Sequence, residues 1–256
     1  MQIDLNCDMG ESFGAWPLGQ DAALMPLITS ANIACGFHAG DPLVMARTVA
    51  LAREHGVALG AHPGYPDLQG FGRRYLDMTG AELEAAVLYQ IGALAGFAQA
   101  AGGTLTHVKP HGALYNRAAG DPATAEPIAR AVRRFSADLI LVGLAGSGLL
   151  DAGRAAGLRV AAEAFADRAY EAGGTLRSRR LPGAIHPDPA TAAAQALSIV
   201  RDGQVRAYDG TLVPIQADTL CIHGDTPDAP AYARAVRAAL EGAGIAVAPL
   251  APVVRA

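Results

Sequence analysis

The sequence predicts an α/β protein in which helices cover a parallel β-sheet. Three observations support this prediction. Short apolar runs alternate with helical stretches about seven times, helix-capping residues precede the helical stretches, and glycines follow them. The pattern by itself leaves two arrangements open, because such a sheet is either open and doubly wound or closed into a barrel.

The predicted elements follow one another in a regular order. The strands are expected at residues 2–6, 31–35, 57–61, 104–109, 138–144, 159–165 and 219–223. Helix starts are marked by a capping residue directly before proline, at Asp41-Pro42, Asp121-Pro122, Asp188-Pro189 and Thr226-Pro227. Thr79 and Glu82 form a further start signal, the capping box. Helix ends are expected at Gly56, Gly102, Gly157 and Gly244.

Two segments depart from this alternation. The stretch VRAYDGTLVPI at 205–215 predicts a hairpin around Asp209-Gly210, as an excursion before the last strand. Residues 85–108 carry no formal charge and place Gly92 and Gly96 in a GxxxG pattern. Polar and glycine residues interrupt that segment, so we expect a core helix packed closely against a neighbour rather than a membrane span. No linker divides the chain, which predicts one domain over residues 1–256.

The composition restricts the classes of function. Of the 256 residues, 51% are hydrophobic and 17% are charged, which allows a substantial core and argues against disorder. A net charge of −4 without a basic cluster argues against a nucleic-acid partner. The N-terminal MQIDLNCDMGES has no basic region followed by an apolar run, so we expect no secretory signal. The sparse cysteines Cys7, Cys35 and Cys221 favour a reducing cytoplasm.

Polar residues collect where the predicted strands end. Asp4, Asn6 and Asp8 share one face of the first strand, opposite an apolar face. The residues at or just beyond the strand ends are Asn6, Asp8, Glu11, Asn32, His38, Asp41, His62, Lys109, His111, Glu163, Asp167, Arg168, His223 and Asp225. The carboxyl ends of parallel strands lie on one side of a sheet and, in a barrel, around one mouth. We therefore expect these residues to gather in one site.

The stretch TLTHVKPHGALYN directs three basic residues the same way. His107 is expected to point into the barrel, Lys109 to reach its rim, and His111 to lie in the loop above. Lys109 has two interpretations. If Lys109 stabilises a developing oxyanion, its loss is expected to lower turnover by roughly 100-fold or more. If Lys109 instead neutralises a buried carboxylate such as Asp4 or Glu163, its loss is expected to cost about 3–5 kcal/mol of stability.

Structural roles compete with functional ones at several positions. His107 lies deep enough to orient a neighbour, and the cysteines fit core filler better than nucleophiles. His and Asp residues at one mouth could also hold zinc or manganese. The sequence contains neither HExxH nor HxH, so the spacing neither demands a metal nor excludes one.

The chain resembles the LamB/YcsF family in six long motifs that occur in order. These are DLNCDMGESFG (4–14), NIACGFHAGDP (32–42), GAHPGYPDLQGFGRR (60–74), HVKPHGALYN (107–116), EAFADRAY (163–170) and CIHGDTP (221–227). The resemblance implies a distorted seven-stranded β/α barrel, similar to those of certain glycoside hydrolases and polysaccharide deacetylases. It also implies ATP-dependent 5-oxoprolinase activity, in which 5-oxo-L-proline is opened to L-glutamate. The implied partners are 5-oxoprolinase subunits B and C, and self-association of the chain stays open.

The strand-end residues and the resemblance together define the expected site. We predict catalytic roles for Asp8, Glu11, His38, His62, Lys109 and His111. We predict substrate-binding roles for Asn6, Asn32, Glu163, Asp167, Arg168, His223 and Asp225. The glycine-rich GLAGSGLL at 143–150 lacks the features of a P-loop and predicts only a tight strand-to-helix turn. ATP, as its magnesium complex, is therefore expected to be handled at least partly by the partner subunits.

Two other functions remain open at this point. One is a metal-dependent amidohydrolase or deacetylase that acts alone, which the barrel type and the His/Asp-rich mouth favour. The other is a non-catalytic subunit that binds substrate or holds its partners together. The many ionisable residues at the mouth argue against the second, because a scaffold does not need them.

Overall fold

The computed structural model describes residues 1–225 and 228–250, and within them seven parallel strands close into a barrel. In order around the ring, the strands are β1 (Gln2–Met9), β2 (Ser30–Ala34), β3 (Ala58–His62), β4 (Leu105–Val108), β5 (Ile140–Leu144), β6 (Arg159–Phe165) and β9 (Thr219–Ile222). Strand β9 pairs with both β6 and β1, and the second pairing closes the ring. The barrel prediction is confirmed, and the open sheet is excluded.

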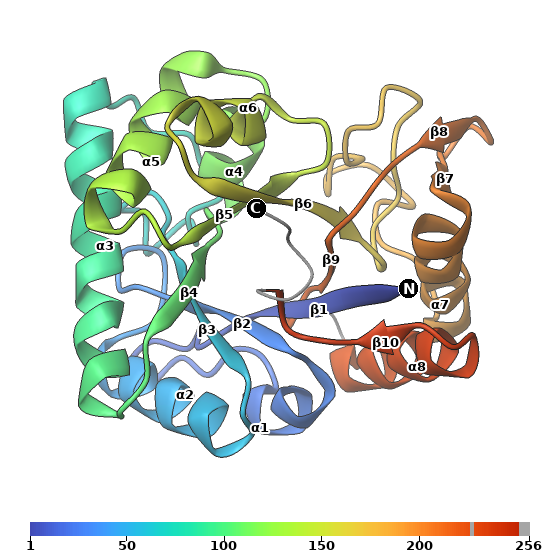
Figure 1. Cartoon of the computed structure of the whole chain (residues 1–256), viewed down its shortest axis with the longest axis horizontal. Helices are drawn as coiled ribbons and strands as arrows, with labels where there is room; N and C mark the ends of the chain where they lie inside the picture. Colours follow the sequence, from blue (N-terminus) through green and yellow to red (C-terminus); the bar gives the residue numbers. More distant parts are fainter. Residues whose placement is uncertain (226–227, 251–256) are drawn as a thin grey trace.

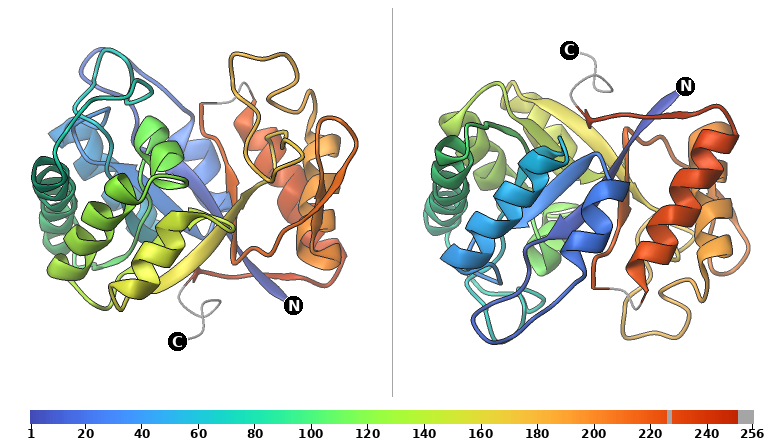
Figure 2. Two further views of the ribbon diagram at one scale, coloured as in Figure 1. Left: turned by 90° about the horizontal axis from the view of Figure 1, so that it is seen from above. Right: turned by 90° about the horizontal axis from the view of Figure 1, so that it is seen from below.

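Helices surround the barrel and connect its strands (Figure 1). They are α1 (Asp21–Leu24), α2 (Pro42–Glu54), α3 (Gly80–Ala100), α4 (Gly112–Ala118), α5 (Pro122–Phe135), α6 (Gly148–Ala155), α7 (Pro189–Leu197) and α8 (Ala229–Gly242). A 3-10 turn (Met25–Leu27) follows α1, and a π-helical turn (Ser198–Asp202) follows α7. In both views of Figure 2, α7 and α8 lie side by side.

The predicted caps form where they were expected. The Asp41 side chain accepts hydrogen bonds from the backbone N–H groups of Leu43 and Val44, and Thr79 forms the full capping box with Glu82. Asp121 and Asp188 cap α5 and α7 in the same way. The four glycines expected at helix ends all have positive φ. The predicted cap at Thr226-Pro227 lies outside the described residues.

The barrel has an apolar outer layer and a polar interior. On β1, Ile3, Leu5 and Cys7 are buried in the main hydrophobic cluster between the strands and the helices. The alternate residues Asp4 and Asn6 are also buried, and they hydrogen-bond to side chains of neighbouring strands. Buried polar groups are stable only where each has a hydrogen-bond partner. Because Asp4 and Asn6 have such partners, the barrel interior can be polar beneath the strand ends.

One glycine makes room inside this interior. A Cβ at Gly60 on β3 would lie 2.0 Å from Nε2 of His107, which is far inside van der Waals contact. The absence of a side chain at Gly60 therefore lets the His107 ring cross the barrel. His107 points inward as predicted, and its Nε2 lies 2.9 Å from Oδ1 of Asn32.

The two exceptional segments have different outcomes. At the hairpin expected over 205–215, β7 (Gln204–Arg206) and β8 (Leu212–Pro214) pair antiparallel on either side of Asp209-Gly210. In α3, Gly92 and Gly96 face outward, and a Cβ at either would meet nothing within 4 Å among the described residues. The expected close packing through GxxxG is therefore wrong. The buried face of α3 consists of larger side chains, such as Val87 and Ile91.

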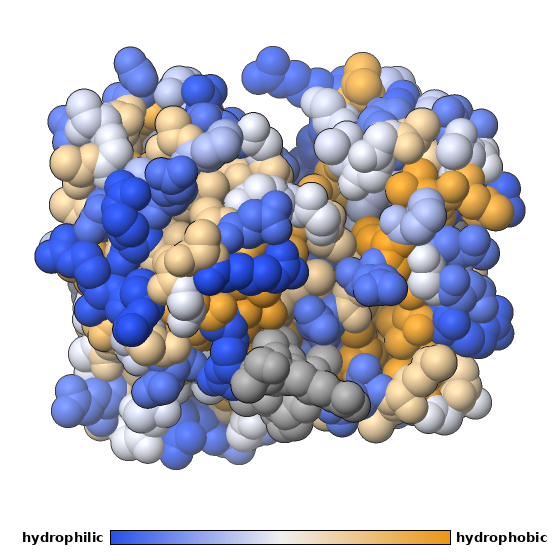
Figure 3. Space-filling model, turned by 45° about the horizontal axis from the view of Figure 1, so that its top comes forward, coloured by the Kyte–Doolittle hydropathy of each residue, from blue (hydrophilic) through white to orange (hydrophobic). Residues whose placement is uncertain are grey.

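The outer surface is mixed in character. On the face drawn in Figure 3, hydrophilic and hydrophobic residues alternate, with hydrophobic ones visible in the recesses between elements. Among the helices of the described residues, none combines the length and apolarity needed to span a membrane. The strand β10 (Ala246–Val247) pairs with the start of β1, outside the closed ring.

Candidate active site

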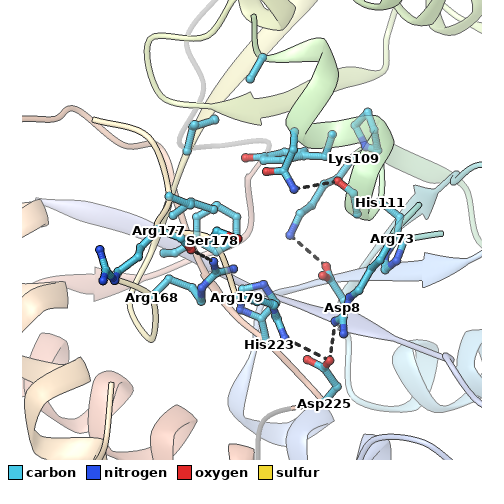
Figure 4. Close-up of a pocket in the computed structure, with 18 of the residues that line it drawn as sticks. Asp8, Arg73, Lys109, His111, Arg168, Arg177, Ser178, Arg179, His223 and Asp225 are labelled. Carbon is cyan, nitrogen blue, oxygen red and sulfur yellow. Dashed lines mark hydrogen bonds and ion pairs between the residues drawn. The ribbon is translucent and has the colours of Figure 1, made fainter. Parts of the chain in front are cut away.

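A cavity of about 610 Å³ lies at the carboxyl ends of the barrel strands. Eight of the predicted site residues line it: Asp8, Glu11, His62, Lys109, His111, Arg168, His223 and Asp225. Figure 4 shows most of these side chains directed toward one space. The remaining predicted residues, Asn6, Asn32, His38, Glu163 and Asp167, are buried outside this lining.

Lys109 is the central cation of the cavity floor and the only lysine in the chain. Lys109 lies just beyond the end of β4. Its backbone N–H donates to the carbonyl oxygen of Ala61 on β3, which fixes the side chain in the barrel mouth. The ammonium lies 2.9 Å from Oδ1 of Asp8 and 2.9 Å from Oε1 of Glu163. Burial opposes the charged form, but Asp8, Cys221 and Glu163 raise the pKa of Lys109 well above its usual range. Lys109 therefore stays charged although it is only 2% exposed, so it lies beneath the rim rather than at it.

Asp8 connects this cation to the histidines. Its Oδ2 lies 3.4 Å from Nε2 of His62, while Oδ1 accepts from Lys109 and from the Asn32 amide. Burial would raise the pKa of Asp8, but His62 and Lys109 hold it well below its usual range. Asp8 is thus an ionised carboxylate at the wall of the cavity.

A layer of amides and carboxylates supports Lys109 and Asp8 from below. The Asn6 amide donates to Oε1 of Glu163 at 2.9 Å, and the Asn32 amide donates to Oδ1 of Asn6 at 2.7 Å. Tyr115 donates its hydroxyl hydrogen to the other oxygen of Glu163 at 2.7 Å. The predicted substrate-binding residues Asn6, Asn32 and Glu163 are therefore placed under the cavity floor, where they bind one another and Lys109.

Asp4 lies deeper in the barrel and does not pair with a basic residue. Its carboxylate accepts hydrogen bonds from the hydroxyls of Thr29, Ser30 and Thr219. Burial raises the pKa of Asp4 to about 6, and these hydroxyls limit the shift. The interpretation of Asp4 as the partner of Lys109 is wrong, whereas the one naming Glu163 is confirmed.

Four ionisable side chains form a compact cluster beside Asp8. Glu11 and His38 come from the loops after β1 and β2, His62 ends β3, and His111 precedes the first residue of α4. Oε1 of Glu11 lies 3.3 Å from Nδ1 of His111 and 3.5 Å from Nε2 of His38. A single point close to all four could hold a metal ion, since their donor atoms all lie within 4.8 Å of one another.

The opposite side of the cavity carries paired charges. His223 directs Nδ1 to the buried Asp167 at 3.1 Å. Burial opposes ionisation of Asp167, but His223 lowers its pKa to about 2. Asp225 pairs with both Arg73 and Arg179. Two guanidinium groups thus share one carboxylate at the rim.

The segment after β6 folds over the cavity and supplies residues that the sequence analysis missed. These are Arg177, Ser178, Arg179 and Arg180. The sequence analysis also missed Arg73, from the loop after β3, and Tyr115 and Asn116, from α4. Arg168 holds this segment by donating to the carbonyl oxygens of Ala184 and Arg177. The signal was present as LRSRR at 176–180, a local run of arginines.

The three cysteines are free and buried, and none lines the cavity among the described residues. Burial raises the pKa of the Cys7 and Cys221 thiols well above the usual range and that of Cys35 to about 12. Because the thiolate is the nucleophile, these values fit core packing rather than covalent catalysis.

A parallel barrel with ionised and basic side chains around a cavity at its carboxyl end defines a (β/α)-barrel enzyme. The chain belongs to the LamB/YcsF family, which it matches over residues 3–255. It is 64% identical to the A subunit of 5-oxoprolinase from Chloroflexus aggregans, over 96% of this chain and 98% of that protein. It is 63% identical to the A subunit of 5-oxoprolinase from Methylococcus capsulatus, over 97% of this chain and 95% of that one.

Solved structures confirm the architecture. The crystal structure of the lactam utilization protein from Thermus thermophilus superposes with a TM-score of 0.92 and 53% identity, covering 97% of this chain and 99% of that one. A structure described as the T48 deacetylase with substrate superposes with a TM-score of 0.50 at 14% identity, covering 98% of this chain and 89% of that one. The second likeness concerns the barrel fold alone, which agrees with the expected similarity to deacetylase barrels.

Proposed function

We propose that this chain is the A subunit of an ATP-dependent 5-oxoprolinase. In this reaction the lactam of 5-oxo-L-proline is opened to L-glutamate, together with subunits B and C. The relatives named as A subunits of 5-oxoprolinase, and the solved lactam utilization protein, support the substrate class. The observation in this chain that best supports the chemistry is the ionised Asp8 beside Lys109 in the cavity.

The cavity suits a small cyclic amide that carries one carboxylate. At the rim, Arg73 and Arg179 share the carboxylate of Asp225, which leaves positive charge for a second anion. Guanidinium groups bind carboxylate and phosphate oxygens in pairs. We assign this rim to the carboxylate of 5-oxo-L-proline or to a phosphoryl group on the reacting molecule.

The floor of the cavity suits the opening of the ring. A five-membered lactam is unstrained and its amide carbon is a poor electrophile, so the reaction needs an activated carbonyl. Phosphorylation of the lactam oxygen by ATP provides such activation. A first water then adds to the carbonyl carbon, the C–N bond breaks and nitrogen takes up a proton, which leaves an acyl phosphate. A second water hydrolyses the acyl phosphate to the free carboxylate of glutamate and phosphate. Asp8 accepts the proton of water, and Lys109 stabilises negative charge on oxygen.

ATP is assigned wholly or partly to the partner subunits, because the sequence holds no P-loop. In this proposal the chain holds the ionisable groups for lactam opening and the partners supply ATP, which explains why the chain needs them. A cytoplasmic location belongs to this proposal, and the unpaired cysteines support it.

The isolated chain is expected neither to hydrolyse ATP appreciably nor to release glutamate, because the ATP-binding elements lie in other subunits. Purified chain, purified partners and the reassembled complex are each given 5-oxo-L-proline and magnesium ATP, and glutamate is measured. Only the complex should release it.

The same assay separates the rival functions. Steady ATP-independent amide hydrolysis by the chain alone would replace the proposal with an amidohydrolase that acts alone. A complex that keeps full turnover when this chain carries Asp8→Asn would favour a non-catalytic role.

A further inference from the structure

The cluster of Glu11, His38, His62 and His111 is more than a set of buried polar residues. Its members come from the ends of four consecutive barrel segments, and each is less than 10% exposed. Buried polar groups normally find hydrogen-bond partners. Within the described residues, however, Oε1 of Glu11 and both ring nitrogens of His38 make no hydrogen bond.

The hydrogen bonds of His62 and His111 determine which ring nitrogen of each carries hydrogen. Nδ1 of His62 lies 2.7 Å from the carbonyl oxygen of Lys109, and Nε2 of His111 lies 2.8 Å from that of Phe71. A carbonyl oxygen only accepts, so both of these nitrogens carry hydrogen. In neutral rings the remaining nitrogens, Nε2 of His62 and Nδ1 of His111, then present lone pairs to each other at 3.0 Å. This contact is repulsive unless a positive species lies between them.

That species is either a shared proton or a metal ion, and the local charge favours the metal. Two carboxylates, those of Asp8 and Glu163, pair with the single lysine, and a third, that of Glu11, lies against His111 in the neighbouring cluster. The formal excess is two negative charges, which a divalent ion balances and one proton does not.

The spacing of the donor atoms also fits a small tetrahedral ion. Zinc binds imidazole nitrogen at about 2.0–2.1 Å, which places neighbouring ligand atoms about 3.3 Å apart. Three of the six separations between donor atoms in this cluster are 3.0, 3.3 and 3.5 Å, and all six are within 4.8 Å. The rings of His62 and His111 are nearly perpendicular, so both lone pairs can reach one point. His38 stacks on His111 with ring centroids 3.8 Å apart, and its ring must turn to join them.

We propose that Glu11, His62 and His111, completed by His38, form a binding site for a divalent transition metal ion of the zinc type. The ligand set of imidazoles and one carboxylate suits such an ion. When bound, the ion would supply a Lewis acid at the cavity wall, next to Asp8. The proposal concerns binding and does not depend on which reaction the cavity performs.

The test is a metal titration of the tag-free full chain after removal of metals with a chelator. Zinc chloride is titrated calorimetrically, and cobalt chloride is followed by its visible absorption. We expect one zinc ion per chain with a Kd of about 1 μM or below. We also expect a cobalt spectrum of tetrahedral type and a higher melting temperature with zinc. A shared proton predicts none of these, so a wild-type chain without stoichiometric zinc binding would overturn the proposal.

Two variants locate the site. Glu11→Gln preserves size and removes the charge, and His38→Ala removes a ring without hydrogen bonds in the described part of the chain. Loss of a residue that only hydrogen-bonds to a metal ligand typically costs roughly 10- to 100-fold in metal affinity. Each variant removes a ligand and should weaken zinc binding by more than this. The matched control is His55→Ala, an exposed histidine at the end of α2, which should bind as the wild type does. Equal affinity in all three variants would overturn the assignment. If a variant misfolds, the wild-type stoichiometry and cobalt spectrum still decide.

Discussion

Replacing Lys109 by methionine is expected to lower the free energy of unfolding by about 3–5 kcal/mol. Lys109 is 2% exposed and lies 2.9 Å from a carboxylate oxygen on each of Asp8 and Glu163. Methionine fills a similar volume but leaves both carboxylates buried without their cation. Urea unfolding followed by circular dichroism measures the loss.

Two control variants make this result specific. Lys109→Met combined with Glu163→Gln removes one of the stranded charges and should recover part of the lost stability. Arg134→Met breaks an exposed ion pair with Glu84, and its effect should stay within about 0.5 kcal/mol. If Lys109→Met unfolds at the wild-type urea concentration, then Lys109 does not neutralise the buried carboxylates, and its proximity to them needs another explanation.

The second large effect concerns turnover. Asp8→Asn in the assembled complex is expected to reduce glutamate release by roughly 100- to 10,000-fold, the usual contribution of a positioned general base. Asp8 faces the cavity, and its contacts with Lys109 and His62 keep it in the ionised form, which is the form that accepts a proton. Asparagine retains the shape of the side chain and one oxygen, but it cannot take up a proton.

Steady-state glutamate release is compared with the chromatographic yield of complex, so that failed assembly is not mistaken for lost chemistry. Asp202→Asn serves as the control, because Asp202 pairs with Arg201 on the surface and should support wild-type turnover. Retention of more than about one tenth of the activity in well-assembled Asp8→Asn complex would remove Asp8 from the proton-transfer step.

The strands and helix starts could be predicted because their signals are local. An Asp before Pro, or a run of apolar residues, acts within a few residues, and Asp41 and Thr79 cap their helices as expected. Closure of the barrel depends on pairing between β9 and β1, which lie near opposite ends of the chain, and strand pattern does not determine it. The family resemblance, rather than the periodicity, predicted that closure.

The candidate site was predicted in part for the same reason. Asp8, His62 and Lys109 were found because parallel strands bring their ends together. Depth along a strand was harder to predict. Asn6 and Asn32 lie one layer below the cavity, since each pair of residues along a strand moves a side chain about 7 Å. Arg179 was missed because the irregular segment after β6 has no period from which its path could be read.

The central claim is that the lactam is opened in the cavity of this chain. Its most direct test is the crystal structure of the assembled complex with 5-oxo-L-proline and a non-hydrolysable ATP analogue. We expect density for the lactam ring in the cavity, with its carbonyl oxygen within hydrogen-bonding distance of Lys109 and its carboxylate at Arg73 or Arg179. A lactam bound entirely within one of the other subunits, away from this cavity, would contradict the account.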